Sequence, residues 1–141
     1  MKSFTLLLGV IFLAGCDPCR GNRACADTFD FKLIDNINGD DLVFGTNPTY
    51  NKDSVYLFTK LQGYSGKMSY PKENKFSSTL LLPVDTFFLH LGSTDTDTLV
   101  MFYDFRKVKC CSTNEGFGKL KFIKFNGVNT ILENNIHVLR K

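Results

Sequence analysis

The sequence is poor in the residues that catalytic and metal sites use most often. Its 141 residues include two histidines and no tryptophan, and acidic and basic side chains nearly balance at a net charge of +3. His90 and His137 are both expected to point outward from strands, and neither accompanies a serine or cysteine in a recognisable nucleophile motif. We therefore expect a non-enzymatic protein with no cofactor and no metal site. A small hydrolase is the least favoured alternative.

Long apolar runs are also missing, but a short one opens the chain. Lys2 precedes an almost unbroken apolar segment from Phe4 to Leu13. A bilayer-spanning helix needs about 20 apolar residues, so this segment is typical of a signal peptide instead. The residues that follow, Leu13-Ala14-Gly15-Cys16, resemble the lipobox of bacterial lipoproteins. The resemblance implies cleavage before Cys16 and acylation of this cysteine, for instance with palmitate. An ordinary signal peptide that is cut elsewhere is the alternative.

This resemblance also implies a domain organisation and a location. Residues 1–15 would be the lipoprotein signal peptide, 16–26 a lipidated tether and 27–141 a single domain. Acyl chains on Cys16 would attach the protein to a membrane of the cell envelope, which we expect to be the outer membrane of a Gram-negative-type bacterium. Whether the domain lies on the periplasmic or the surface face is not predicted. The expected partners are the membrane and an envelope protein or glycan. Nucleic acid is not expected, because the resemblance implies export and the chain carries no nucleic-acid motif.

Four cysteines follow the lipobox, at Cys19, Cys25, Cys110 and Cys111. An even number of cysteines in an exported chain suggests disulfide bonds. Neighbouring strand residues point to opposite faces, so we favour bridges that join the first two cysteines to the adjacent pair. A four-cysteine zinc site is the weaker alternative, since the spacing does not match the usual ligand pattern. Reduced, buried cysteines are a third alternative.

From residue 28 onward apolar residues recur at every second position, which predicts half-buried strands. The segments with this pattern are 29–33, 55–61, 76–82, 87–91, 99–105 (with a continuation to 110 as the alternative), 120–125 and 136–139. Turn signals such as Asn38-Gly39 and Asn126-Gly127 separate them. Seven to nine short strands predict an all-β fold, a single antiparallel β-sandwich of immunoglobulin or transthyretin type with a phenylalanine-rich core. A partly closed β-barrel is the structural alternative.

The candidate ligand contacts are four tyrosines around a glycine-containing stretch, Tyr50, Tyr56, Tyr64 and Tyr70. Aromatic rings on a β scaffold can stack on sugars, although ordinary packing explains them more simply. Residues 105–141 carry eight basic and two acidic side chains, which suits an anionic partner or simply a solvated face. A membrane-anchored binding or scaffolding domain is therefore the favoured function, and a glycan-binding accessory lipoprotein is the alternative.

Two acidic segments could each suggest calcium. One is the loop from Asp35 to Asp41, and the other contains Asp95 and Asp97. The first lacks the alternating oxygen ligands of a calcium loop, and two carboxylates are too few for a calcium site without further ligands. Both segments are therefore expected to be turns, although on a strand Asp95 and Asp97 would share a face.

Overall fold

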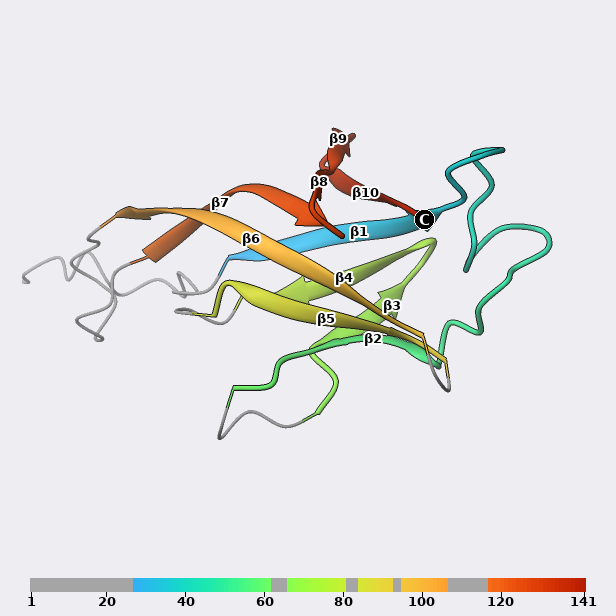
Figure 1. Cartoon of the computed structure of the whole chain (residues 1–141), viewed down its shortest axis with the longest axis horizontal. Coiled ribbons are helices and arrows are strands. Elements are labelled where there is room, and N and C mark those ends of the chain that lie inside the picture. The colour runs from blue at the N-terminus through green and yellow to red at the C-terminus, as the bar shows by residue number, and fades with distance from the viewer. Residues whose placement is uncertain (1–26, 62–65, 81–83, 93–94, 107–116) are drawn as a thin grey trace, which may run out of the picture.

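The computed structural model describes residues 27–61, 66–80, 84–92, 95–106 and 117–141. In this part of the chain all regular structure is β (Figure 1). The ten strands are β1 (Thr28–Ile34), β2 (Val55–Phe58), β3 (Ser69–Lys72), β4 (Lys75–Thr79), β5 (Thr86–Leu91), β6 (Thr96–Arg106), β7 (Phe117–Phe125), β8 (Val128–Asn129), β9 (Ile131–Glu133) and β10 (Ile136–Arg140). No helix in the described ranges is long and apolar enough to cross a membrane.

The strands form two five-stranded sheets. Sheet A has the order β3-β4-β1-β10-β9, and sheet B has the order β2-β5-β6-β7-β8. The two sheets pack face to face and do not close into a barrel, so the predicted β-sandwich is confirmed and the barrel alternative is not. Strands 29–33, 55–58, 87–91 and 99–103 lie where the alternating pattern predicted them.

The core lies between the inward faces of the two sheets. Sheet A contributes Phe29, Phe31 and Phe76, with ring centroids 5.9 Å apart for the first two and 5.2 Å apart for Phe31 and Phe76. Sheet B contributes apolar side chains that include Phe87 and Leu99, both fully buried. Burying a large apolar side chain stabilises a fold by about 1.5–3 kcal/mol, so this core supplies most of the driving force. The phenylalanine-rich core is thus present.

One pairing differs from the antiparallel prediction. β1 and β10 run parallel, with Phe31 opposite His137 and Leu33 opposite Leu139. Parallel neighbours need a long connection, and here almost the whole domain lies between the two strands. The alternating pattern shows which face of a strand is buried but does not give the direction of its partner, so this pairing could not be read from the sequence.

The lateral edges of the two sheets approach each other on both sides. On one side, the Met68 amide donates to the carbonyl of Leu57 at 2.8 Å, and the Leu57 amide donates to Ser69 Oγ at 2.8 Å. These bonds join the start of β3 to β2. On the other side Thr130 alone separates β8 of sheet B from β9 of sheet A, so the chain crosses directly between the layers. Both edges are therefore partly protected from pairing with a strand of another molecule.

Three further sequence expectations need correction. First, the short strands β3, β8 and β9 were not predicted; in β3, Pro71 and the preceding glycines mask the edge-strand pattern, and β8 and β9 have only two and three residues. His137 is not outward-facing: it is 8% exposed, and its ring contacts Phe29 edge-on at 6.2 Å. Its Nδ1 lies 3.1 Å from the Thr130 hydroxyl, which allows burial of a polar ring. Third, Asp97 belongs to β6 rather than to a turn.

Candidate binding face

The outer face of sheet B carries a row of aromatic side chains. Tyr56 and Phe58 alternate with core residues along β2, and Phe88 and His90 do so along β5. The register of the sheet sets Tyr56 beside His90 and Phe58 beside Phe88. The ring centroids of these two pairs are 4.7 and 5.5 Å apart. His90 therefore points outward, as the sequence predicted.

A second ring pair lies further along the same face. Phe102 of β6 and Phe122 of β7 are direct cross-strand neighbours, and their rings stack at 4.3 Å with 14° between their planes. Both are more than one-third exposed, at 36% and 37%. Large exposed rings on adjacent strands commonly mark an interaction surface.

Three lysines lie over these rings. The Nζ atoms of Lys60, Lys67 and Lys124 are 4.3, 4.8 and 5.4 Å from the ring centroids of Phe88, Tyr56 and Phe102. Lysine stems can cover apolar surface while the ammonium group stays in water. We call this surface the aromatic face. It consists of Tyr56, Phe58, Phe88, His90, Phe102 and Phe122 with Lys60, Lys67 and Lys124.

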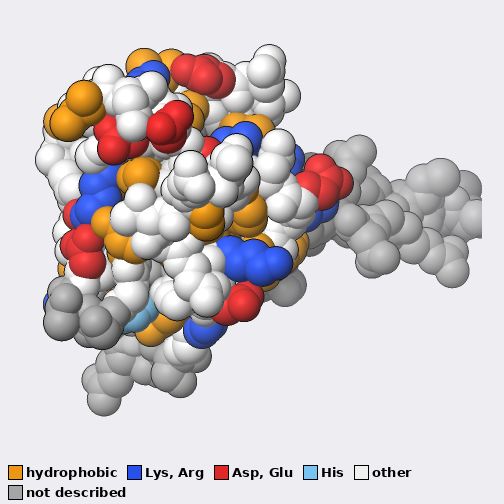
Figure 2. Space-filling model, turned by 90° about the vertical axis from the view of Figure 1, so that its right-hand side faces the viewer, with side chains coloured by type: hydrophobic (Ala, Val, Ile, Leu, Met, Phe, Trp, Pro, Cys, Tyr) orange, Lys and Arg blue, Asp and Glu red, His pale blue; other side chains and the backbone are white. Residues whose placement is uncertain are grey.

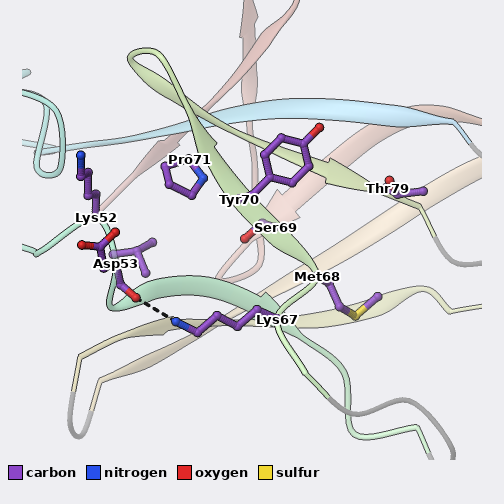
Figure 3. A pocket seen from close by; sticks show the side chains of 9 residues that line it. Lys52, Asp53, Lys67, Met68, Ser69, Tyr70, Pro71 and Thr79 are labelled. Carbon is purple, nitrogen blue, oxygen red and sulfur yellow. Dashed lines mark hydrogen bonds between the residues drawn. The ribbon is translucent and has the colours of Figure 1, made fainter.

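A groove borders the aromatic face at the edge where β2 meets β3 (Figure 3). It encloses about 450 Å³ and is lined in part by Tyr70, Lys52 and Asp53. Lys67 also lines this groove and donates to the Asp53 carbonyl at 2.9 Å. Because Lys67 also lies over Tyr56, the groove and the aromatic face share this lysine.

The four candidate tyrosines do not gather at one site. Tyr56 belongs to the aromatic face and Tyr70, which is 57% exposed, lines the groove. Tyr50 packs against the core and donates a hydrogen bond to Asp95 at 3.2 Å. Burial, together with the carboxylates nearby, raises the pKa of Tyr50. Tyr64 lies outside the described residues, as do the lipobox cysteine Cys16 and the disulfide candidates Cys19, Cys25, Cys110 and Cys111.

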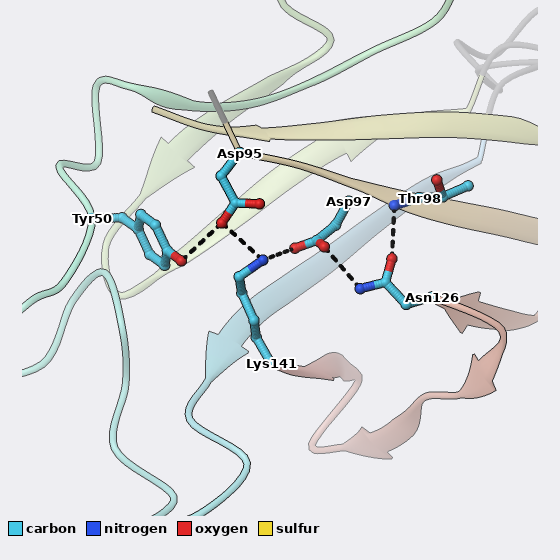
Figure 4. Close-up of polar contacts among 6 residues, drawn as sticks. All are labelled: Tyr50, Asp95, Asp97, Thr98, Asn126 and Lys141. Carbon is cyan, nitrogen blue, oxygen red and sulfur yellow. Dashed lines mark hydrogen bonds and ion pairs between the residues drawn. The ribbon is translucent and has the colours of Figure 1, made fainter. Parts of the chain in front are cut away.

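The two carboxylates of the second acidic segment share a face and converge on an ammonium group (Figure 4). Lys141 Nζ lies 2.6 Å from Asp97 and 2.9 Å from Asp95. Asn126 completes this cluster: its side-chain amide donates to Asp97 at 2.8 Å, and its oxygen accepts from the Thr98 amide at 3.0 Å. The arrangement fixes the start of β6 to the end of the chain and to the β7–β8 turn.

The electrostatics of the cluster follow from these contacts. The hydrogen bond from Lys141 holds the pKa of Asp95 below its usual range. Burial opposes the charge of Lys141, but the bonds to Asp97 and Asp95 outweigh it and raise the pKa of this lysine. The cation that the two acids hold is thus supplied by the chain itself. In the described ranges no three His, Cys, Asp or Glu side chains are grouped as a metal site.

The acidic loop from Asp35 to Asp41 is a turn, as predicted. Asp35 Oδ1 accepts hydrogen bonds from the amides of Ile37 and Asn38, and Asn38 Oδ1 accepts from the amide of Asp40. Side-chain oxygens that cap the following backbone in this way stabilise tight turns. On the face of the molecule that Figure 2 shows, acidic, basic and hydrophobic side chains are interspersed.

Sequence reasoning identified Tyr56 as a candidate ligand contact and His90 as an outward residue but missed the rest of the aromatic face. The available signal was the presence of Phe58, Phe88 and Phe102 at positions that alternate with core residues. What the sequence lacked was the register that makes them neighbours. Comparisons with protein-family models, with curated proteins and with solved structures give no match to this chain.

Proposed function

We propose that the protein is a lipoprotein of the cell envelope whose β-sandwich is a non-enzymatic binding domain. In this proposal the acylated Cys16 holds the domain at the membrane, and residues 17–26 act as a tether. The aromatic face of sheet B is the surface that meets the partner.

The support for anchoring is in the sequence. A positive residue, a short apolar run and Leu13-Ala14-Gly15-Cys16 follow one another in the order that lipoprotein signals have. One acyl chain gives only marginal attachment, whereas a diacylated cysteine with a further N-acyl chain holds a domain firmly on a bilayer.

The observation that carries the binding role is the lysine-covered aromatic face. Phe102 and Phe122 stay more than one-third exposed, although ten strands provide a core in which other phenylalanines are fully buried. Exposed aromatic side chains that cluster on one face are typical of a recognition surface.

Anchoring is tested with Cys16→Ala. The natural chain, expressed in a bacterium that processes lipoproteins, is expected to incorporate labelled palmitate and to sediment with membranes. The variant should incorporate no label, because it lacks the thiol that is acylated; without its lipobox it also keeps the apolar signal segment, so the label and not sedimentation decides the test. Palmitate incorporation equal to that of the natural chain would contradict lipid anchoring through Cys16.

Binding is tested by placing a photo-cross-linking amino acid at Phe122, in cells. The matched control carries the same amino acid at Leu132 of β9, an apolar position of sheet A that is 57% exposed. Cross-linked species are expected from position 122 and not from position 132. Equal cross-linking at both positions, or none at 122, would refute the assignment of the binding face.

A further inference from the structure

The three lysines of the aromatic face lack the carboxylate partners that Lys75 and Lys32 of sheet A have. On sheet A, Lys75 lies 2.6 Å from Asp30 and Lys32 lies 4.0 Å from Asp41. In the part of the chain that the structure describes, Lys60, Lys67 and Lys124 form no ion pair with a carboxylate, and Lys67 bonds only to a backbone carbonyl. Their charges are therefore available to an anionic partner.

The rings provide two separate stacking platforms. Phe88 pairs with Thr98 of β6, and Phe102 lies four residues further along that strand. At about 3.3 Å per residue and about 4.8 Å between strands, the two platforms are roughly 14 Å apart. A ligand that uses both must therefore be extended. Lys124 of β7 is the register partner of Val100, which lies midway between Thr98 and Phe102 along β6, and its Nζ lies over Phe102.

A hollow beside Phe88 adds polar groups to the first platform. It encloses about 370 Å³ and is lined by Phe88 and Lys60 together with Thr59, Asp85 and Thr86. A ring with hydroxyl and carboxylate groups next to it can contact both the apolar face and the hydroxyls of a sugar.

From this combination we propose that the aromatic face binds an acidic polysaccharide. Sugar rings would stack near Phe88 and on the Phe102–Phe122 pair, while carboxylate, sulfate or phosphate groups on the polymer would bond to Lys60, Lys67 and Lys124. The proposal rests on the proposed function, since it names the ligand class of the same face. A protein partner fits less well, because lysine is depleted at the centre of protein interfaces and here lysines lie among the rings.

The test measures binding of the full chain, purified in a non-ionic detergent, by isothermal titration calorimetry. The probes are polygalacturonate, dextran sulfate and neutral dextran of similar length. Both acidic polymers are expected to bind at least tenfold more tightly than dextran. The affinity should fall as the salt concentration rises, since salt screens exposed charges. Binding of neutral dextran as tight as that of the acidic polymers would refute the role of the lysines.

Two pairs of substitutions separate stacking from charge. Phe102→Leu with Phe122→Leu keeps apolar side chains but removes the rings, and Lys60→Gln with Lys124→Gln removes charge. Each pair should weaken binding of the acidic polymers at least tenfold. The control Lys72→Gln, an exposed lysine of β3 in sheet A, should change it less than twofold. If the glutamine pair weakens binding and the leucine pair does not, attraction is only ionic and the proposal fails.

A lipid surface is the other source of anionic groups, and vesicles test it. Flotation uses vesicles of phosphatidylglycerol and phosphatidylcholine with residues 17–141, so that neither the signal segment nor acyl chains can hold the protein there. The proposal predicts that the Phe102→Leu and Phe122→Leu pair does not alter flotation. Flotation that depends on these rings, without binding of either acidic polymer, would overturn the glycan assignment. Cross-linking at position 122 would in that case still support the proposed binding function.

Discussion

Replacing Lys141 by methionine tests whether the cluster of Asp95, Asp97 and Asn126 stabilises the fold. The substitution keeps an unbranched apolar stem but removes the ammonium group that lies 2.6 Å from Asp97 and 2.9 Å from Asp95. Two carboxylates on the same face of the chain would then lack their shared cation. Like charges held at short distance repel, and Asp97 is only 10% exposed in its side chain.

The expected loss in free energy of unfolding follows from how deeply the charged side chains of the cluster are buried. Exposed ion pairs contribute about 0–1 kcal/mol, and removing one partner of a buried pair costs about 3–5 kcal/mol. The side chains of Lys141 and Asp95 are 24% and 42% exposed, so the cluster lies between these limits. We expect Lys141→Met to lower the free energy of unfolding by about 2 kcal/mol, which for a domain of this size lowers the melting temperature by about 8 °C.

The assay is urea unfolding followed by far-UV circular dichroism at several pH values. Lys32→Met is the matched control, because Lys32 has the same side-chain exposure but lies 4.0 Å from its partner Asp41. It should cost less than about 1 kcal/mol. A loss for Lys141→Met no larger than that of the control would refute the reasoning.

The pH dependence of the stability difference provides a second test of this prediction. The folded-state pKa of Asp95 is depressed, so its contribution is present above its unfolded-state pKa and is lost as the pH falls through the folded-state value. The stability difference between the natural chain and Lys141→Met should therefore be full at pH 7 and shrink on acidification below about pH 4. A difference that grows on acidification would contradict the role of the carboxylates.

Three further predictions concern the core, a buried histidine and a close backbone approach. Phe76→Ala should lower the free energy of unfolding, measured with urea, by about 3–5 kcal/mol, because Phe76 is fully buried. Phe102→Ala on the aromatic face should lower it by less than about 1 kcal/mol. Similar losses for the two variants would contradict the assigned faces. Burial lowers the folded-state pKa of His137, so the unfolded chain binds a proton more readily and stability should fall as the pH drops below about 6.5. His137→Asn should reduce the change in unfolding free energy between pH 7.5 and 5.5. An unchanged pH dependence would show that other titrating groups cause it. Gly45→Ala would bring a Cβ into the backbone carbonyl of Asp41 and should cost about 1–3 kcal/mol, measured by thermal unfolding, where an unchanged melting temperature would count against the clash.

The sequence predicted the sandwich because most of its strands are buried on only one face. In Phe87, Leu89 and Leu91 the apolar side chains recur at every second residue, and all three are buried. β10 departs from this rule. His137 and Val138 are neighbours on opposite faces of the strand and are both buried, so alternation carries no signal there. The same loss of signal explains why His137 was assigned to the wrong face.

The aromatic face depends on a kind of information that a single strand does not contain. Tyr56, Phe58 and Phe88 occupy the positions that alternate with core residues, so each was predictable as an outward side chain. Their contact depends on the pairing of β2 with β5, which is set by the turns and by the whole core.

The composition nevertheless held a clue. Twelve of the fourteen phenylalanines belong to residues 27–141, and not all of them lie in the core. Phe87 and Phe125 of sheet B are buried, whereas Phe58, Phe88, Phe102 and Phe122 lie on the opposite face of this sheet. Packing in the core explains the buried rings, whereas the outer rings stabilise the sheet only through their cross-strand stacking and lysine contacts. A binding role accounts for both their exposure and the uncompensated lysines above them. The cross-linking contrast between positions 122 and 132 is therefore the experiment on which this interpretation depends most.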